Sequence, residues 1–561
     1  MDVWGSRRFR VRGAIALAAV AAVAIGMGSC AVRDRKTGAE AVVEDFTTAI
    51  DKRDYDGAAQ LTSYPSGASA TLKQVFAGLD PGKPDYHVTQ YIGLDNTTGL
   101  FSMTGAWNFG ENRNWKYDLQ GTVRKLSVGW RISWDPTVVM PQLDSKHTVK
   151  LVSTEALPPP KVNDIVGAPL LTEQNINVIE LDPAKTTDPV ASTNALADAI
   201  SPVAPLITGP SLMQQLSASK GKPITAVDLR DGDFAILQPR MANIPGVVML
   251  QQPKLVAADR RVWSPLLDAL TNVWKTNRDQ HAGWGVQLFE PDGKFVTQLA
   301  GEQGPPGPDI AATMDQRLQR AAEDAVVSVG TAASIVAIQP SSGAVVAAAQ
   351  NNYASQVGDN VAFTGTYPVG GLIELFKNVA AVTKKKAPQD VSVGDAADAA
   401  SMLGVGIDFK IPGLEETTGR LPTGQNAAEN VGRGNAADSL QASPWGMAIA
   451  AAAVANGQVP KPMITIGQPA TTEADLAALP GDVTDRLRGM LHDGAGAPEN
   501  VSLARYQGVQ AYSATSGTNG WLIATMGDLA FAIHIDSPDA GDAPARMAAR
   551  LLRSLASPDG A

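Results

Sequence analysis

Apolar positions near the start of the chain recur first at helical spacing and then in alternation. The helical set predicts an amphipathic helix over Ala39–Lys52; its members are Val42, Val43, Phe46, Ala49 and Ile50. Strand-like patterns follow over Tyr86–Ile92, Leu100–Phe109, Trp115–Arg124 and Leu126–Asp135. In the last of these, Trp130, Ile132 and Trp134 alternate with polar residues, so we expect one face of the strand to be buried. A helix followed by an antiparallel sheet predicts a small α+β domain.

The pattern after residue 310 is that of mixed helices and strands. Gln316–Val327 has helical periodicity, and Ser334–Ala349 predicts two strands joined by a turn at Ser341–Gly343. Pro444–Asn456 is rich in alanine and apolar on every side, which predicts a buried helix. Trp521–Ile535 predicts a pair of central strands.

Two proline-rich segments, Pro158–Pro160 and Gly304–Pro308, interrupt the chain. Between them, Lys161–Leu299 mixes short strands and helices without a strong period. Because 561 residues are too many for one hydrophobic core, we expect about three or four domains. We also expect both proline-rich segments to be cut by proteases and to separate independent cores.

The first 30 residues have the composition of an export signal. Met1–Arg12 carries four arginines, Ala14–Met27 is apolar and uncharged, and Gly28 and Ser29 precede Cys30. The apolar run is too short to span ~30 Å of hydrocarbon as a stable helix. Small residues before a cysteine resemble a bacterial lipobox, which implies that Cys30 is lipidated and becomes the mature N-terminus. The expected location is the outer face of the bacterial cytoplasmic membrane, with a lipid anchor.

Two alternatives stay open for this segment. One is an ordinary anchor helix with an incidental cysteine, although Cys30 is the only cysteine of the chain. The other concerns the export route, since the adjacent Arg7 and Arg8 fit a twin-arginine signal as well as the general secretory route.

Charge and composition exclude some classes of function. The net charge of -10 argues against a nucleic-acid partner, because no basic stripe is evident that would neutralise phosphates. The five histidines have no helical metal-ligand spacing: His87, His147, His281, His492 and His534. We therefore expect neither a metal site nor a cofactor.

The C-terminal half resembles the transpeptidase domain of penicillin-binding proteins in a series of short segments that keep the family's order. They correspond to its first helix, first strands, active-site turn, middle segment and long helix: Thr313–Glu323, Ile335–Gly343, Tyr367–Gly370, Leu403–Gly406, Pro412–Gly413, Gly419–Pro422 and Ala442–Gly457. Each segment alone is a weak match, so the argument rests on their common order.

The N-terminal half agrees with this resemblance. The domain that ends at Trp130–Trp134 looks like the NTF2-like domain of some of these proteins. Asp164, Gly167 and Leu170 keep the spacing of the opening motif of the pedestal, or dimerisation, domain, whose leading Arg-Gly is replaced by Pro159-Pro160. The resemblance implies a multidomain α+β fold: a lipoprotein signal peptide (1–30), an NTF2-like domain (38–146), a pedestal domain (150–303) and a serine β-lactamase-like transpeptidase α/β domain (310–557).

The family's reaction is acyl transfer from a D-Ala-D-Ala stem peptide to a serine, and β-lactams trap that serine. A serine needs a base to take its proton. The family supplies a lysine three residues later on the same helical face. A Ser-x-Asn motif shuttles protons, and a Lys-Thr-Gly strand motif offers a cation to the substrate carboxylate.

This sequence lacks all three elements. Gly371 stands at the nucleophile position, Glu374 stands at the lysine position, and no Ser-x-Asn occurs between Glu374 and Leu403. The strand motif has no lysine and reads Thr515, Ser516, Gly517, Thr518. We expect Glu374 to repel the carboxylate of substrate and antibiotic, or to be a neutral carboxyl if it is buried without a cation.

Other short matches have the wrong order and flanking residues, so chance explains them: Lys36-Thr37-Gly38, Ser192-Thr193-Asn194 and Ser217-Ala218-Ser219-Lys220. We interpret Thr383–Lys386 as a basic helix end that complements the helix dipole, and Gly432–Gly434 as a turn.

The favoured hypothesis is a catalytically inactive, cell-wall-associated lipoprotein. It would bind peptidoglycan precursors or cell-wall and division proteins, as a monomer or a homodimer. The alternative is an active D,D-transpeptidase that β-lactams acylate through a displaced serine. Ser516 is the better candidate for that role, because Ser443 stands at a structural position of the family. A β-lactam sensor would need a transmembrane relay, which the sequence does not predict.

Overall fold

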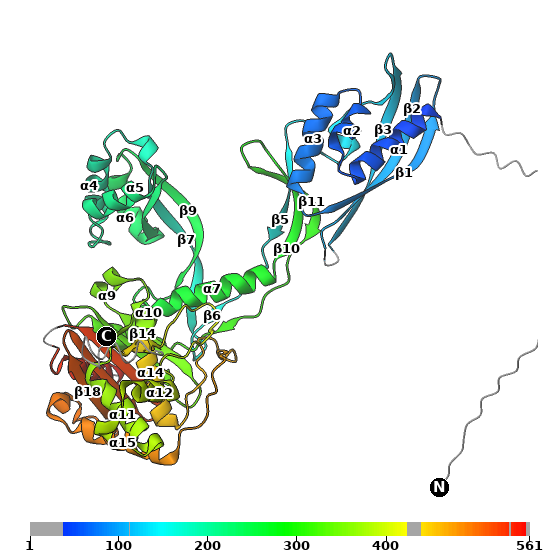
Figure 1. Ribbon diagram of the computed structural model, residues 1–561. Helices are drawn as coiled ribbons and strands as arrows, with labels where there is room; N and C mark the ends of the chain where they lie inside the picture. The colour runs from blue at the N-terminus through cyan, green and yellow to red at the C-terminus, as the bar shows by residue number, and fades with distance from the viewer. Residues whose placement is uncertain (1–36, 111–112, 423–438, 538–539, 557–561) are drawn as a thin grey trace, which may run out of the picture. The chain divides into compact units, whose positions relative to one another are not determined.

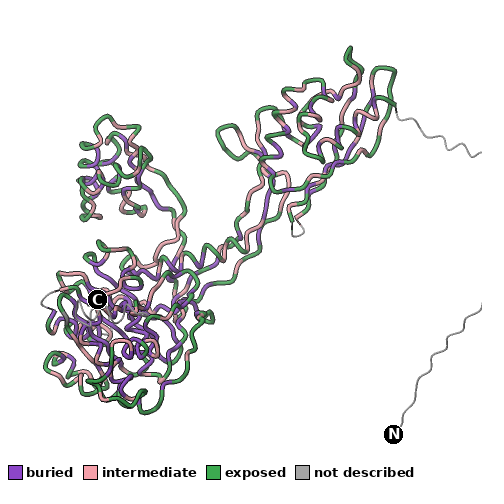
Figure 2. Tube along the Cα trace, in the orientation of Figure 1, coloured by how far each residue is buried: buried purple, intermediate pink, exposed green. Residues whose placement is uncertain are grey.

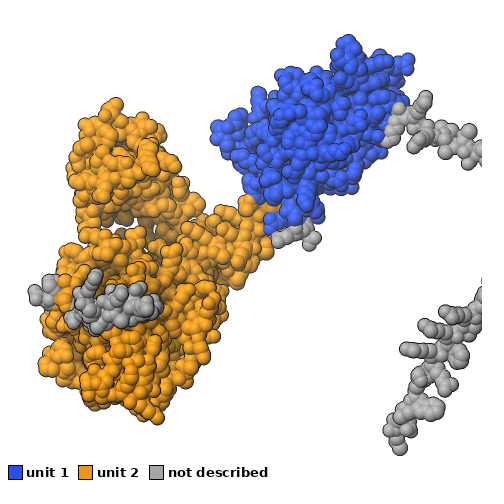
Figure 3. Space-filling view, in the orientation of Figure 1, with its two compact units in different colours: residues 1–152, 285–301 blue, residues 153–284, 302–561 orange. Residues whose placement is uncertain are grey.

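The computed structural model describes residues 37–110, 113–422, 439–537 and 540–556. Two compact units emerge, one of residues 1–152 with 285–301 and one of residues 153–284 with 302–561 (Figure 3). Cys30 and the predicted export signal lie outside the described residues. Within the described part, no helix has both the length and the apolar character needed to cross a bilayer.

The first unit begins with three helices packed on a four-stranded antiparallel sheet of order β1-β2-β3-β4 (Figure 1). Its elements are α1 (Gly38–Asp51), α2 (Tyr55–Gln60), α3 (Pro65–Gly78), β1 (Lys83–Gly93), β2 (Thr98–Asn108), β3 (Asn114–Leu126) and β4 (Gly129–Ile132). The predicted first helix and first three strands are confirmed, whereas α2 and α3 were not predicted. The fourth strand is shorter than predicted, because residues 127 and 128 form a hairpin turn and Gly129 has φ +103°.

The core of this domain is aromatic. Trp107 is 1% exposed and its ring lies 4.9 Å from that of Phe76 in α3. The Tyr86 hydroxyl hydrogen-bonds the Tyr117 hydroxyl at 2.8 Å and donates to the Val139 carbonyl at 2.9 Å. Of the residues predicted to form the buried face of the fourth strand, Ile132 is fully buried, whereas Trp130 and Trp134 are only partly buried.

A second small sheet of the first unit joins distant parts of the sequence. Its strands, in the order β11-β10-β5, are β5 (Thr148–Thr154), β10 (Gly283–Phe289) and β11 (Phe295–Glu302). Residues 285–301 therefore group with the N-terminal unit, whereas the sequence division placed them in the pedestal domain. Strand pairing across more than 100 residues has no local sequence signal, so the pairing of β10 with β5 was not predicted.

The second unit starts with a sheet in which β7 pairs along its length with β9 and, over its second half, with β8. The elements of this region are β6 (Val162–Asn163), β7 (Pro169–Leu181), α4 (Pro189–Ile200), α5 (Gly209–Ala218), β8 (Ile224–Arg230), α6 (Asp231–Met241), β9 (Val247–Ala257), α7 (Pro265–Gln280) and β12 (Ile310–Ala311). Ile179, Leu196 and Leu212 belong to a small separate core formed with α4, α5 and α6.

The other end of this region shares its core with the C-terminal part of the chain. Val162, Leu270 and Trp274 belong to one hydrophobic cluster with Ile310 and with residues as distant as Ala532. The expectation that Gly304–Pro308 separates independent cores is therefore wrong. The reason is that β12 pairs in parallel with β6, while Ser264 at the start of α7 donates to the Ala348 carbonyl at 2.6 Å.

The C-terminal part is a five-stranded antiparallel sheet of order β14-β13-β20-β19-β18 between two layers of helices. The strands are β13 (Ala333–Gln339), β14 (Ala344–Gln350), β18 (Gln510–Ser516), β19 (Asn519–Met526) and β20 (Leu529–Asp536). Most of their residues are buried (Figure 2), which confirms the predicted pairs at 334–349 and 521–535.

Alternation along the strands divides this part into two cores. Ile335 and Ala337 face α8 (Gln316–Val326) and α16 (Ala543–Ala556). Val336 and Ile338 face the other layer, which contains α11 (Ile373–Lys384), α12 (Val393–Met402), α14 (Pro444–Asn456) and α15 (Gly481–Ala495). The predicted buried helix at 444–456 is confirmed, because eleven of its residues from Pro444 to Val454 are buried.

The remaining described elements are short. They are α9 (Asn352–Val357), α10 (Val361–Thr364), β15 (Tyr367–Pro368), β16 (Gly419–Arg420) and β17 (Gln441–Ala442), with one-turn 3₁₀ helices η1 (Pro136–Val138), η2 (Pro183–Lys185), η3 (Gly370–Leu372), η4 (Pro388–Asp390) and the longer η6 (Pro498–Leu503). Strands β15, β17 and β16 form a small sheet beside the start of α11.

Candidate functional site

Gly371 lies in the 3₁₀ turn η3, immediately before α11. The preceding β15 pairs with β17, so that Tyr367 is opposite Ala442, and the Val369 amide donates to the Leu440 carbonyl at 3.1 Å. Gly370 takes φ +53°, a conformation that favours glycine. Residues 367–370 therefore form a tight turn that places Gly371 directly before helix α11, as the family resemblance implies.

Gly371 faces the edge strand β18. A methyl group placed on Gly371 would lie 3.0 Å from Cβ of Ala514. Two positions far apart in sequence thus meet with no polar side-chain atom at the contact. The strand residue beside Gly371 is Ala514, one position before the Thr515 that the motif comparison placed at the lysine position.

Glu374 lies in the first turn of α11 and has a cationic partner. Its Oε1 accepts from Nζ of Lys377 at 2.8 Å, and the two side chains are 46% and 29% exposed. Glu374 is therefore about half exposed and has a cation beside it, so the condition set for a neutral, buried carboxyl is not met. An i,i+3 ion pair of this exposure contributes only about 0.3 kcal/mol to helix stability, but it neutralises the carboxylate locally.

Tyr512 of β18 lies on the same side of the strand layer as α11. Burial raises the pKa of its hydroxyl, and the carboxylates of Glu374 and Glu499 raise that pKa further. Tyr512 is therefore a protonated phenol at neutral pH and is no base. Of the described groups, the methyl group of Ala514, the ion pair of Glu374 and the neutral phenol of Tyr512 offer no activated nucleophile.

The degenerate strand motif spans the end of β18 and the hairpin turn that follows it: Thr515 and Ser516 belong to the strand, and Gly517 and Thr518 form the turn. β18 ends at Ser516, which is opposite Asn519, and Gly517 takes φ +57°. Thr515 and Thr518 are exposed. The structure describes the backbone but not the side chain of Ser516, so its role as a displaced nucleophile stays untested.

A buried histidine supports the turn before Gly371. The ring of His534 stacks on Tyr367 with 3.8 Å between centroids, and its Nε2 is 2.9 Å from Oδ1 of Asn519. Trp521 lies opposite His534 in the sheet and donates from Nε1 to the Pro368 carbonyl at 2.9 Å. Burial lowers the pKa of His534 to about 3, so the imidazole is neutral and structural at pH 7.

Ser443 is occupied by a structural role. It is the N-cap of α14: its Oγ accepts from the Gly446 amide at 2.9 Å and donates to the Thr417 carbonyl at 2.5 Å. The residue is fully buried. These contacts leave the hydroxyl no path to a substrate, in agreement with the expectation from the family position.

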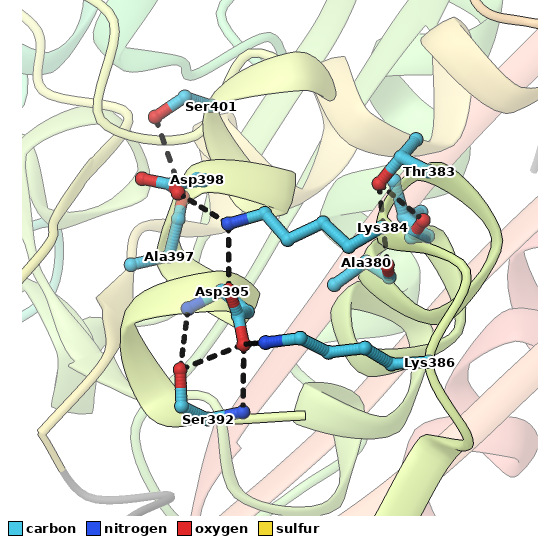
Figure 4. Close-up of polar contacts among 10 residues, drawn as sticks. Ala380, Thr383, Lys384, Lys386, Ser392, Asp395, Ala397, Asp398 and Ser401 are labelled. Carbon is cyan, nitrogen blue, oxygen red and sulfur yellow. Dashed lines mark hydrogen bonds and ion pairs between the residues drawn. The ribbon is translucent and has the colours of Figure 1, made fainter. Parts of the chain in front are cut away.

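The basic run after α11 ties two helices together. Nζ of Lys384 is 2.6 Å from Asp395 and 2.8 Å from Asp398, and Nζ of Lys386 is 2.7 Å from Asp395 (Figure 4). Lys384 first, then Lys386 and the Ser392 hydroxyl, hold the pKa of Asp395 well below its ordinary value. Lys384 and Lys386 thus join the end of α11 to α12 through ion pairs, in addition to the expected role of a basic helix end that complements the dipole of α11.

The short chance matches lie in other elements. Ser192 and Thr193 are buried in α4, and Ser219 is the C-cap of α5, where its hydroxyl donates to the Leu216 and Lys222 carbonyls. Lys36 and the predicted turn at Gly432–Gly434 lie outside the described residues. Within the described part, no group of three or more His, Cys, Asp or Glu side chains could hold a metal ion.

Sequence reasoning missed the residues that surround the site. Lys377 could have been found from its i,i+3 spacing to Glu374. Trp521 and His534 could have been placed on one face only after the hairpin register was known, because a one-residue slip would move either side chain to the opposite face.

The family model of the NTF2-like N-terminal transpeptidase domain matches residues 38–147. These residues contain α1 to β4, and the match supports a relationship to the penicillin-binding proteins. No curated protein matches the chain. The chain is therefore a multidomain α+β protein whose N-terminal domain matches the NTF2-like N-terminal transpeptidase domain family.

Proposed function

We propose that this chain is a cell-wall-associated homologue of the penicillin-binding proteins that binds wall precursors or protein partners and performs no acyl transfer. The observation that supports it is the contact between Gly371 and Ala514, where neither residue has a side-chain hydroxyl or amine. Acyl transfer needs a nucleophile beside a base, and single members of such a unit contribute little without the others.

The charge around Gly371 fits binding better than catalysis. Glu374, three residues after Gly371, holds Lys377 in an ion pair. An ammonium group that is partly exposed can still contact a carboxylate of a stem peptide.

Restoring the two residues of the family motif should not restore the reaction. Gly371→Ser with Glu374→Lys supplies a hydroxyl and an amine, but it places two lysines at i and i+3 and leaves the methyl group of Ala514 opposite. We expect trace acylation by a fluorescent penicillin at most. Stoichiometric labelling of this double variant would show that the rest of the site is competent and would contradict the proposal of a site unfit for catalysis.

The proposed location rests on Cys30. A lipidated Cys30 would hold the mature chain at the outer face of the cytoplasmic membrane. The Cys30→Ala variant should accumulate as an unprocessed or released protein in cell fractionation, and the wild-type chain is the control. A Cys30→Ala protein that remains in the membrane at its mature mass would disprove the lipid anchor.

A further inference from the structure

A basic cavity lies on the side of the five-stranded sheet opposite Gly371. It has a volume of about 420 Å³ and lies between α16, the end of η6 and the residues after α8. Met547 and Ala549 of its wall belong to the core on the α8 and α16 side, whereas Leu372 and Ile373 beside Gly371 belong to the other core. The cavity is therefore distinct from the candidate site described above.

The wall of this cavity carries four arginines and no acidic residue: Arg505, Arg546, Arg550 and Arg553. Arg546, Arg550 and Arg553 stand at i, i+4 and i+7 on α16, which puts them on one face of that helix. Asp542 pairs with Arg546, and Asp324 pairs with Arg550 at 2.6 Å. Asp324 also attracts Arg553, whereas Arg505 has no ion pair among the described residues. The wall of the cavity, which has four guanidinium groups and no carboxylate, is therefore basic in a chain whose net charge is -10.

A second observation points to a ligand. Ser502 lines the same cavity, and its Oγ is buried without a hydrogen-bond partner among the described residues. A buried hydroxyl without a partner costs about 1–3 kcal/mol, so such groups usually meet a partner when a site is filled. A hydroxyl beside guanidinium groups donates well to an anionic oxygen.

We propose that this cavity binds a phosphate group carried by a small molecule or a lipid headgroup. Guanidinium groups match phosphate oxygens in paired hydrogen bonds, and a phosphate monoester carries about two negative charges at neutral pH. The volume exceeds that of a single phosphate, so part of the substituent on the phosphate occupies the cavity as well.

The test is calorimetric titration of the full chain with inorganic pyrophosphate at low salt. We expect saturable binding that weakens about tenfold in Arg505→Gln, because one charge-assisted hydrogen bond is lost. Arg505 has no ion pair of its own among the described residues, and its guanidinium lies 5.1 Å from the ring of Tyr506. Arg240→Gln removes the same charge from an exposed position on α6 and should leave the affinity unchanged.

Ser502→Ala separates ligand binding from a structural role. If Oγ of Ser502 donates to the ligand, this variant should bind pyrophosphate several-fold more weakly and should unfold no more easily than the wild type in phosphate-free buffer.

A second titration with a short-chain phosphatidic acid in monomeric form identifies the source of the phosphate. Arg505-dependent binding of this lipid alone assigns the site to a lipid headgroup, and Arg505-dependent binding of pyrophosphate assigns it to a soluble phosphate. Binding of neither probe, or equal affinity in Arg505→Gln and Arg240→Gln, would overturn the proposal.

Discussion

Gly371 matters through the side chain that it lacks. The family comparison identified this position from the preceding turn at Tyr367–Gly370, and the structure places it against Ala514 of β18. The sequence could predict that Gly371 lacks the family's hydroxyl, but it could not predict that Ala514 lies beside it. The packing of η3 against an edge strand has no local sequence pattern. For the same reason Lys377 was overlooked as the partner of Glu374.

The close approach of Gly371 to Ala514 predicts a steric cost for a restored serine. Gly371→Ser should lower the free energy of unfolding by about 1 kcal/mol, because its Cβ would lie 3.0 Å from that of Ala514. In the Ala514→Gly background the same change should cost less. A double-mutant cycle by urea denaturation measures this coupling. Additive costs would mean that the two residues do not touch.

Glu416 predicts a pH dependence of stability. Burial raises its pKa to about 7, although its oxygens accept from the Phe409 amide at 2.9 Å and from Nε1 of Trp445 at 2.7 Å. The folded state then holds a proton that the unfolded chain has lost, so stability falls as the pH rises from the ordinary glutamate pKa of 4.5 to about 7. The loss in the free energy of unfolding over this pH range is on the order of 2 kcal/mol.

Glu416→Gln should remove this part of the slope, because a carboxamide does not titrate. Urea denaturation at several pH values measures it, and Glu415→Gln, at the exposed neighbouring glutamate, is the matched control. An unchanged slope in Glu416→Gln would show that Glu416 is ionised in the folded protein across this range.

At the scale of elements, periodicity predicted the helices and strands that bury one face or all faces. α1, α8, α14 and the hairpins β13–β14 and β19–β20 were all found, because each has a strong apolar pattern of helix or strand period. α2 and α3 were missed, since Tyr55–Gln60 is only six residues long and Pro65–Gly78 consists mainly of small and polar residues. β7 and β9 were missed because exposed residues in the middle of each strand interrupt any regular alternation of buried and exposed positions.

The N-cap of α14 gives a prediction at this scale. Ser443→Ala removes both the cap of the helix and a hydrogen bond to the Thr417 carbonyl in a fully buried place. We expect a loss of about 2 kcal/mol in the free energy of unfolding. The same change at Ser392, the exposed N-cap of α12, should cost less. If Ser443→Ala and Ser392→Ala lose the same free energy of unfolding in urea denaturation, burial does not strengthen the N-cap of α14.

At the scale of the whole molecule, the proline-rich segments were a poor guide to domains. Pro160 accepts a hydrogen bond from Nε1 of Trp274 at 2.8 Å, and β12 follows Gly304–Pro308 to pair with β6. Prolines interrupt helices and strands locally, but they do not decide which segments share a core. The N-terminal domain was predicted well, because its helix and strands are consecutive in sequence and pair with their neighbours.

The return of β10 and β11 to the first unit predicts how a nicked protein behaves. Leu157 is 53% exposed and follows β5, so limited proteolysis should cut beside it. The two fragments should still elute together from a native sizing column, because β5 remains paired with β10. They should separate in urea. An N-terminal fragment that elutes alone under native conditions would contradict this strand pairing.

The central claim is that the site around Gly371 performs no acyl transfer, and intact mass after incubation with a β-lactam tests it most directly. The wild-type protein should keep its unmodified mass, because Gly371 and the facing Ala514 offer no nucleophile. A stoichiometric adduct on the wild-type protein would contradict the account, and a peptide map would then show whether Ser516 or another residue had been acylated.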